Sequence, residues 1–155
     1  MHVFNLAEMF SRLAPAARLL GLDPGARRIG LALSDVSLLL ASPYGSLARR
    51  RLKENAAEIT VLAAREGVGG LVVGWPLALD GEEGPAAQSA RDWAGALAEA
   101  TGLPVTLWDE RFSTAAALRM LIEEADLSRK RRAEATDRVA AALMLQGALD
   151  AHRAA

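Results

Sequence analysis

The chain has 155 residues, the length of one ordinary domain, and its 52% hydrophobic and 24% charged residues exclude an intrinsically disordered protein. It contains no cysteine, and its two histidines, His2 and His152, stand near the two ends. The composition therefore excludes disulfides, thiol nucleophiles and Cys-ligated metal sites, and it argues against a histidine zinc site or a Ser-His-Asp triad. Any catalysis must use carboxylates, arginine, lysine or hydroxyl groups.

The formal net charge is −1, so the total does not demand a nucleic-acid partner. Of the 18 basic residues only Lys53 and Lys130 are lysines, and in such an arginine-rich chain only clustered arginines carry functional weight. The N-terminus lacks a basic segment followed by an apolar core, and no stretch reaches 18 apolar residues. We expect a cytoplasmic protein.

Two parts are expected, an N-terminal helical extension over residues 1–17 and a single domain over 18–155. The extension has apolar residues at helical spacing and a closing proline: Val3, Leu6, Phe10, Leu13 and Pro15. This pattern predicts a short helix that packs on the domain.

The rest of the chain predicts a mixed sheet with helices on both faces. Short apolar runs broken by glycine and proline predict an antiparallel meander at 19–23, 29–33 and 38–41. Helices and strands then alternate, with a polar, basic loop expected at 126–135. The expected helices are 55–65, 87–100, 114–125 and 136–152, and the expected strands are 69–76 and 104–108. The order βββαβαβαα belongs to the α/β class.

Asp23 ends the first apolar run, directly before a Pro-Gly pair. A carboxylate in a buried strand is costly unless it is paired, hydrogen-bonded or bound to a metal. Gly25 and Gly30 remove side chains near it, which lets a ligand or another backbone approach closely. A ligand site and a simple turn-forming aspartate both remain open.

Two further acidic positions also end or begin elements. Asp109 and Glu110 follow the strand 104–108, and only one of them should face a site with Asp23, because successive strand residues point to opposite faces. Asp137 stands at the expected start of the last helix, where the helix dipole favours a carboxylate and simple capping is the alternative.

Taken together, Asp23, one of the adjacent acids Asp109 and Glu110, and Asp137 predict a metal site. Clustered carboxylates repel one another, and a hard divalent cation is the usual resolution. Oxygen ligands without His or Cys select Mg²⁺ or Mn²⁺, and two such ions catalyse phosphodiester hydrolysis. The sequence therefore indicates a two-metal nuclease whose catalytic and metal-binding residues are Asp23, one of the adjacent acids Asp109 and Glu110, and Asp137.

The ordered motifs resemble the YqgF/RuvX family, which is related to the RuvC resolvase. The matching segments are Leu22-Asp23-Pro24-Gly25, Ile29-Gly30-Leu31-Ala32-Leu33-Ser34-Asp35, Val73-Gly74-Trp75-Pro76, the Asp80-Gly81-x-x-Gly84 loop, Asp109-Glu110-Arg111-Phe112-Ser113-Thr114 and Asp137-Arg138-Val139-Ala140-Ala141. The resemblance runs from about Leu19 to Leu149. It implies an RNase H-like fold with a five-stranded mixed sheet, and the family's catalytic acids map onto Asp23, Glu110 and Asp137. Members are described as Holliday junction resolvases and as nucleases that trim the precursor of small-subunit ribosomal RNA.

Basic residues near these acids are the expected nucleic-acid contacts, because Arg forks bind phosphate. They lie beside Asp23, beside Glu110 and upstream of Asp137: Arg27, Arg28, Arg111, Arg129, Lys130, Arg131 and Arg132. The run at 49–53 is the next candidate.

We therefore expect a metal-dependent endonuclease that processes precursor rRNA, with a ribosomal subunit precursor as a partner and no membrane association. A Holliday junction resolvase and a non-catalytic ribosome-assembly factor remain as alternatives, and a homodimer remains open. An ATP-binding domain of the actin and sugar-kinase type is disfavoured, because such proteins need two domains of this kind.

Overall fold

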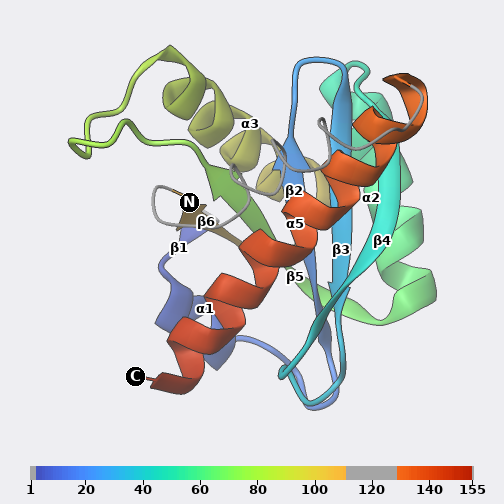
Figure 1. Cartoon of the computed structure of the whole chain (residues 1–155). Helices are drawn as coiled ribbons and strands as arrows, with labels where there is room; N and C mark the ends of the chain where they lie inside the picture. The colour runs from blue at the N-terminus through green and yellow to red at the C-terminus, as the bar shows by residue number, and fades with distance from the viewer. Residues whose placement is uncertain (1–2, 111–128, 155) are drawn as a thin grey trace.

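The computed structural model describes residues 3–110 and 129–154 (Figure 1). Its centre is a six-stranded mixed sheet in the order β1-β6-β5-β2-β3-β4. The strands are β1 (Val3–Phe4), β2 (Arg18–Pro24), β3 (Arg28–Ser34), β4 (Ala41–Ala48), β5 (Val68–Trp75) and β6 (Val105–Asp109). The helices are α1 (Leu6–Ser11), α2 (Leu52–Glu66), α3 (Pro85–Thr101) and α5 (Arg129–Ala154).

The sheet has six strands rather than the five expected. The additional strand is β1, which pairs in parallel with β6 through Val3 and Phe4. Two residues are too few to show an alternating pattern in a sequence, so β1 owes its existence to pairing with β6. The expected helix of residues 1–17 is present as α1, and Asn5 caps it by accepting a hydrogen bond from the Glu8 N–H.

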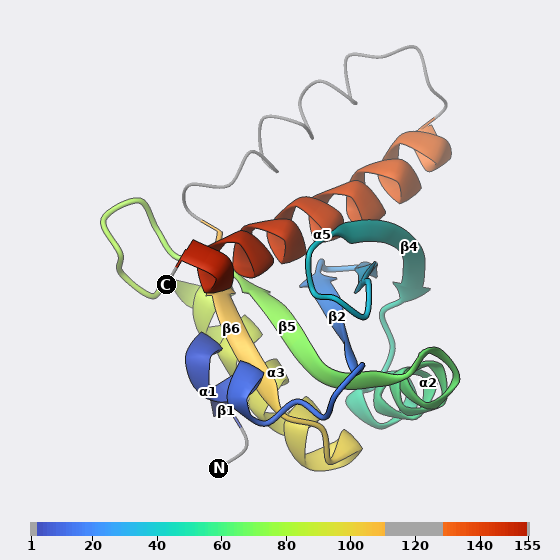
Figure 2. The same ribbon diagram turned by 90° about the horizontal axis from the view of Figure 1, so that it is seen from below.

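Helices cover both faces of the sheet, with α2 and α3 on one side and α5 on the other (Figure 2). Alternate residues of β2 supply the two apolar layers. Leu20 and Leu22 face α2 and α3, whereas Leu19 belongs to the layer under α5. By the same alternation Asp23 lies on the α5 side of the sheet, which is therefore the side that carries the site.

Helix α5 crosses β2 and β3 at very short range because both strands have glycine on this face. A Cβ at Gly21 would lie 3.0 Å from the Leu145 Cβ, and one at Gly30 would lie 2.1 Å from the Asp137 carbonyl oxygen. The sequence predicted a close backbone approach at Gly30, and this contact confirms it.

The third strand of the meander was misplaced by the sequence analysis. Residues 38–41 were expected to form it, but β4 is Ala41–Ala48 and Leu38 has a positive φ of 58°. Asp35 accepts hydrogen bonds from the N–H groups of Leu39 and Leu40, which folds this apolar run into a turn. Pro43 is tolerated because β4 is an edge strand.

Helix α5 begins earlier than predicted. Residues 126–135 were expected to be a loop, but the helix starts at Arg129, so the basic residues 129–132 form its first turn. Their charges gave no apolar periodicity from which a helix could be predicted. The predicted helix 114–125 lies outside the described residues. Among the helices that the structure describes, none is long and apolar enough to cross a membrane.

Candidate active site

The three predicted acids, Asp23, Glu110 and Asp137, line one cavity of about 230 Å³. Pro24, Gly25, Gly74 and Pro76 complete its described lining. The carboxylates reach it from three separate elements, the end of β2, the residue after β6 and helix α5. Asp109 does not line the cavity, which agrees with the expectation that only one of the two adjacent acids faces it.

Asp23 and Asp137 are related through Gly30. In the antiparallel pair of β2 and β3, Asp23 lies directly opposite Gly30. The Asp137 backbone lies against the α carbon of the same glycine. One strand residue without a side chain therefore sets how close the backbone of α5 comes to the end of β2.

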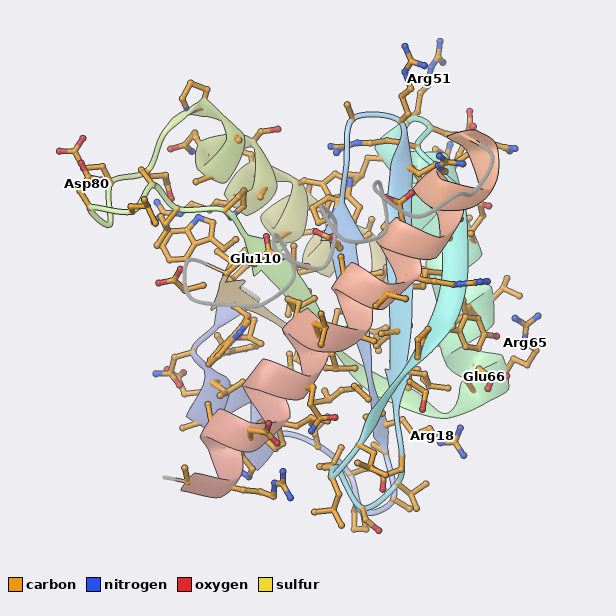
Figure 3. The ribbon with its side chains drawn as sticks, viewed as in Figure 1. Arg18, Arg51, Arg65, Glu66, Asp80 and Glu110 are labelled. Atoms are coloured by element: carbon orange, nitrogen blue, oxygen red, sulfur yellow. The ribbon has the colours of Figure 1, made fainter. Side chains whose placement is uncertain are left out.

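Glu110 follows β6 and is held next to β5. Its N–H donates a hydrogen bond of 3.2 Å to the Trp75 carbonyl, so the parallel pairing of the strands continues to the residue after β6. A Cβ at Gly74 would lie 2.8 Å from the Glu110 Oε1, and this oxygen is buried. The Glu110 carboxylate thus lies over β5, in the space above Gly74 (Figure 3). A side chain at position 74 would fill this space.

A polar network fixes Trp75, whose carbonyl holds Glu110. The indole Nε1 donates to Glu83 Oε2 at 3.1 Å, and the Arg91 Nε lies 3.2 Å from the same oxygen. The Arg91 guanidinium lies 5.6 Å from the centroid of the Trp75 ring. No pattern in the sequence indicates this support, because its members come from β5, the following loop and α3.

Asp137 forms an ion pair with Arg28, whose Nε lies 3.1 Å from the Asp137 Oδ2. The sequence placed Asp137 at a helix start, but it lies eight residues after Arg129, the first residue of α5. The helix dipole acts within the first turn and does not reach this position. The charge that compensates Asp137 comes instead from β3.

The carboxylate oxygens suit a hard cation such as Mg²⁺ or Mn²⁺. Within residues 3–110 and 129–154, however, no group of three or more His, Cys, Asp or Glu side chains is close enough to hold a metal ion. The structure brings the three acids to one cavity with Asp137 paired to Arg28. The oxygen donors of the three acids suit the predicted ions. In this structure the described carboxylates line the same cavity without lying close enough together to coordinate one ion.

The side chains of two of the predicted basic residues, Arg27 and Arg28, are described. Arg27 is exposed in the turn between β2 and β3, and Arg28 is half-buried against Asp137. Arg111 lies outside the described residues. Arg129, Lys130, Arg131 and Arg132 lie in α5, and only their backbone is described.

Comparison with known proteins agrees with this architecture. The family profile described as "RuvX: Holliday junction resolvase" matches residues 17–151, a range that includes all three carboxylates. A protein of Gluconacetobacter diazotrophicus named "Putative pre-16S rRNA nuclease" is 61% identical over 151 residues, which cover 97% of this chain and 98% of the relative. A protein of the same name from Acidiphilium cryptum is 55% identical over 150 residues, covering 97% of this chain and 94% of the relative.

Among solved structures, the T. thermophilus RuvC in complex with a Holliday junction substrate has a TM-score of 0.53 at 16% identity. The match covers 89% of this chain and 96% of the RuvC chain. At this identity the likeness concerns the fold, and it confirms the expected RNase H-like α/β architecture. By the profile match and by the identity to its relatives, the chain belongs to the RuvX family.

Proposed function

We propose that this chain is a metal-dependent endonuclease that hydrolyses phosphodiester bonds in the precursor of small-subunit ribosomal RNA. The observation that carries the proposal is the convergence of Asp23, Glu110 and Asp137 on one cavity. Three carboxylates from separate elements are hard to explain by stability alone, because each must be desolvated near the others. The names of the relatives supply the substrate in the proposal.

Asp23, Glu110 and Asp137 are the residues that would hold Mg²⁺ or Mn²⁺, with two ions expected. Such ions, when bound, activate a water molecule and stabilise the leaving oxygen. The chain itself provides oxygen donors from three rigid elements around one reacting phosphate. Gly74 leaves room for the Glu110 carboxylate, and Arg28 orients the carboxylate of Asp137.

The test is cleavage of a precursor rRNA fragment, analysed on gels with Mg²⁺ and with Mn²⁺. We expect Asp23→Asn, Glu110→Gln and Asp137→Asn each to lower the cleavage rate about 100-fold or more. Full activity of Asp23→Asn or Glu110→Gln would overturn the mechanism. A cleavage rate that does not change when the metal is chelated would also overturn it.

The same variants also separate a catalytic from a structural role of the acids. Removing one charge from a repelling cluster relieves repulsion, so we expect Asp23→Asn and Glu110→Gln to keep or raise the thermal stability in metal-free buffer. Asp137→Asn also loses its partly exposed ion pair with Arg28, which offsets the gain by less than about 1 kcal/mol. A large loss of stability in all three variants would favour a structural role.

The description of the family supports a second substrate, the four-way DNA junction. RNase H-like sites recognise the shape of the backbone more than the sequence, so both substrates belong in the same assay. Cleavage of the junction alone would replace the rRNA proposal with a resolvase. Cleavage of neither substrate by the metal-loaded protein would favour the assembly-factor alternative.

A further inference from the structure

Five basic residues lie together where the turn between β2 and β3 meets the connection from β4 to α2. We refer to Arg27, Arg49, Arg50, Arg51 and Lys53 as the cationic ridge. The ridge adjoins the cavity, because Gly25, which lines the cavity, lies two residues before Arg27. Figure 3 shows Arg51 at this end of the molecule, far from Arg18 and Arg65 at the opposite end.

The ridge differs from the other arginines in its charge balance. Arg27, Arg50, Arg51 and Lys53 are exposed, and no carboxylate of the described residues forms an ion pair with any of them. Outside the ridge, five arginines form ion pairs, whereas Arg12 lies over the Phe4 ring and the exposed Arg138 forms no ion pair within the described residues. The compensated pairs are Arg18 and Arg65 with Glu66, Arg28 with Asp137, Arg91 with Glu83, and Arg153 with Asp150. Most of the described cations without an ion pair are therefore gathered at the ridge, which an arginine-rich composition alone would not explain.

The backbone beneath these cations is held firmly. The Arg49 N–H donates to the Arg27 carbonyl, and the Arg49 guanidinium donates to the Gly25 carbonyl, both at 2.8 Å. The fully buried Asn55 accepts a hydrogen bond from the Arg50 N–H and donates one to the Ala48 carbonyl. A buried amide and two cross-loop hydrogen bonds therefore tie the ridge to the wall of the cavity.

Folding gains little from placing these charges here. Neighbouring cations repel one another, and Arg51 and Lys53 lie at the start of α2, where positive side chains oppose the helix dipole. Glu54 is the acidic residue of that first turn and is itself exposed. A polyanion would compensate the ridge as a whole.

We propose that the cationic ridge binds the phosphodiester backbone of the nucleic acid on the side where it leaves the cavity past Gly25. Guanidinium groups bind phosphate oxygens in paired geometry, and such contacts position a substrate without reading its sequence. The ridge would thus hold phosphates a few nucleotides from the bond that is cut. This inference rests on the proposed nuclease function, since it assigns that site its flanking contacts.

The test compares two double variants that each remove two arginines. Arg50→Ala with Arg51→Ala removes exposed ridge charges whose side chains form no hydrogen bond or ion pair with the described residues, so the fold should be kept. Arg18→Ala with Arg65→Ala is the matched control at the opposite end (Figure 3). Both are made in the Asp23→Asn background to prevent cleavage, and circular dichroism checks their folding. Binding to a precursor rRNA fragment and to a four-way DNA junction is measured over a range of KCl concentrations.

We expect the ridge variant to bind more weakly at low salt and to lower the slope of log K against log salt by about 1.4 to 1.8, the value for two lost phosphate contacts. The control should keep the parent slope. If the ridge variant and its parent have equal slopes while the wild-type protein still cleaves nucleic acid, the ridge does not bind the phosphodiester backbone. The nuclease proposal would then still stand. Failure of every preparation to bind or cleave either substrate would overturn both.

Discussion

Gly30→Ala tests the contact that brings α5 to the active site. An added Cβ would lie 2.1 Å from the Asp137 carbonyl oxygen and 2.6 Å from its carbonyl carbon. Both are backbone atoms of a helix packed on the sheet, so no rotation of a side chain relieves the clash. Either the helix or strand β3 must shift.

The expected loss of stability is at the upper end of the range for overpacked cores, about 3 kcal/mol. For a domain of this length each kcal/mol lowers the Tm by about 2–4 °C, so the Tm should fall by about 6–12 °C. Cleavage should also fall at temperatures where the variant remains folded. The reason is that Asp137 moves away from Asp23, which lies opposite Gly30 on β2.

The matched control is Gly45→Ala. Gly45 is also a strand glycine, on the edge strand β4, and an added Cβ would meet nothing within 4 Å. Its stability should change by no more than about 0.5 kcal/mol, and its activity should be unchanged. Thermal unfolding followed by circular dichroism measures both variants. A Gly30→Ala protein with the Tm and activity of wild type would refute the close crossing of α5.

Three further predictions follow from single contacts. Gly74→Ala places a Cβ 2.8 Å from the Glu110 Oε1, which is the end of a flexible side chain and can move away. The kcat should therefore fall while the Tm changes by less than about 3 °C. An unchanged kcat would show that the position of this carboxylate is unimportant. The N–H groups that bind Asp35 hold the pKa of its carboxyl below the ordinary value. That stabilisation is present above the unfolded-state pKa and is lost as the pH falls through the folded-state pKa, so the stability advantage of wild type over Asp35→Ala in urea unfolding should shrink in acid. Arg131→Ala with Arg132→Ala should weaken binding to RNA or DNA at low salt and flatten its salt dependence without altering metal affinity; a retained slope would remove this turn of α5 from the binding surface.

The parts of the fold that the sequence predicts well are those with strong apolar patterns. The strands expected at 19–23, 29–33, 69–76 and 104–108 are present with each boundary shifted by one residue. The helices expected at 55–65 and 87–100 are also present, each longer by a few residues. Their apolar faces pack against the sheet in one core cluster, and this packing requires the helical spacing of apolar residues that the sequence shows.

The elements that the sequence analysis misplaced depend on other interactions. Leu38, Leu39 and Leu40 look like a strand, but Asp35 binds the N–H groups of the latter two and turns the chain. The first turn of α5 consists of charged residues, so its helical state could not be inferred from apolar spacing. In both segments a local hydrogen bond or the continuation of a helix outweighs the pattern of hydrophobic residues.

The convergence of the carboxylates was predictable, whereas their surroundings were not. Asp23 and the Asp109-Glu110 pair end apolar segments, and Asp137 was expected to begin a helix. Strand alternation allowed only one of the two adjacent acids to face Asp23, and the family resemblance assigned that place to Glu110. The ion pair between Arg28 and Asp137 joins β3 to α5, and no feature of sequence spacing indicates which cation meets which acid across such a distance.

The position of Asp137 within α5 changes the explanation for its charge. At a helix start the dipole would stabilise a carboxylate by about 0.3–1 kcal/mol, and stability alone could account for the residue. Eight residues into α5 that contribution is absent. Arg28 compensates the charge, but both side chains are more than a quarter exposed, so the pair contributes less than about 1 kcal/mol. Neither the helix dipole nor the ion pair with Arg28 therefore gives much stability to an aspartate at this position, which supports our proposal that Asp137 acts with Asp23 and Glu110 in the cavity that all three line.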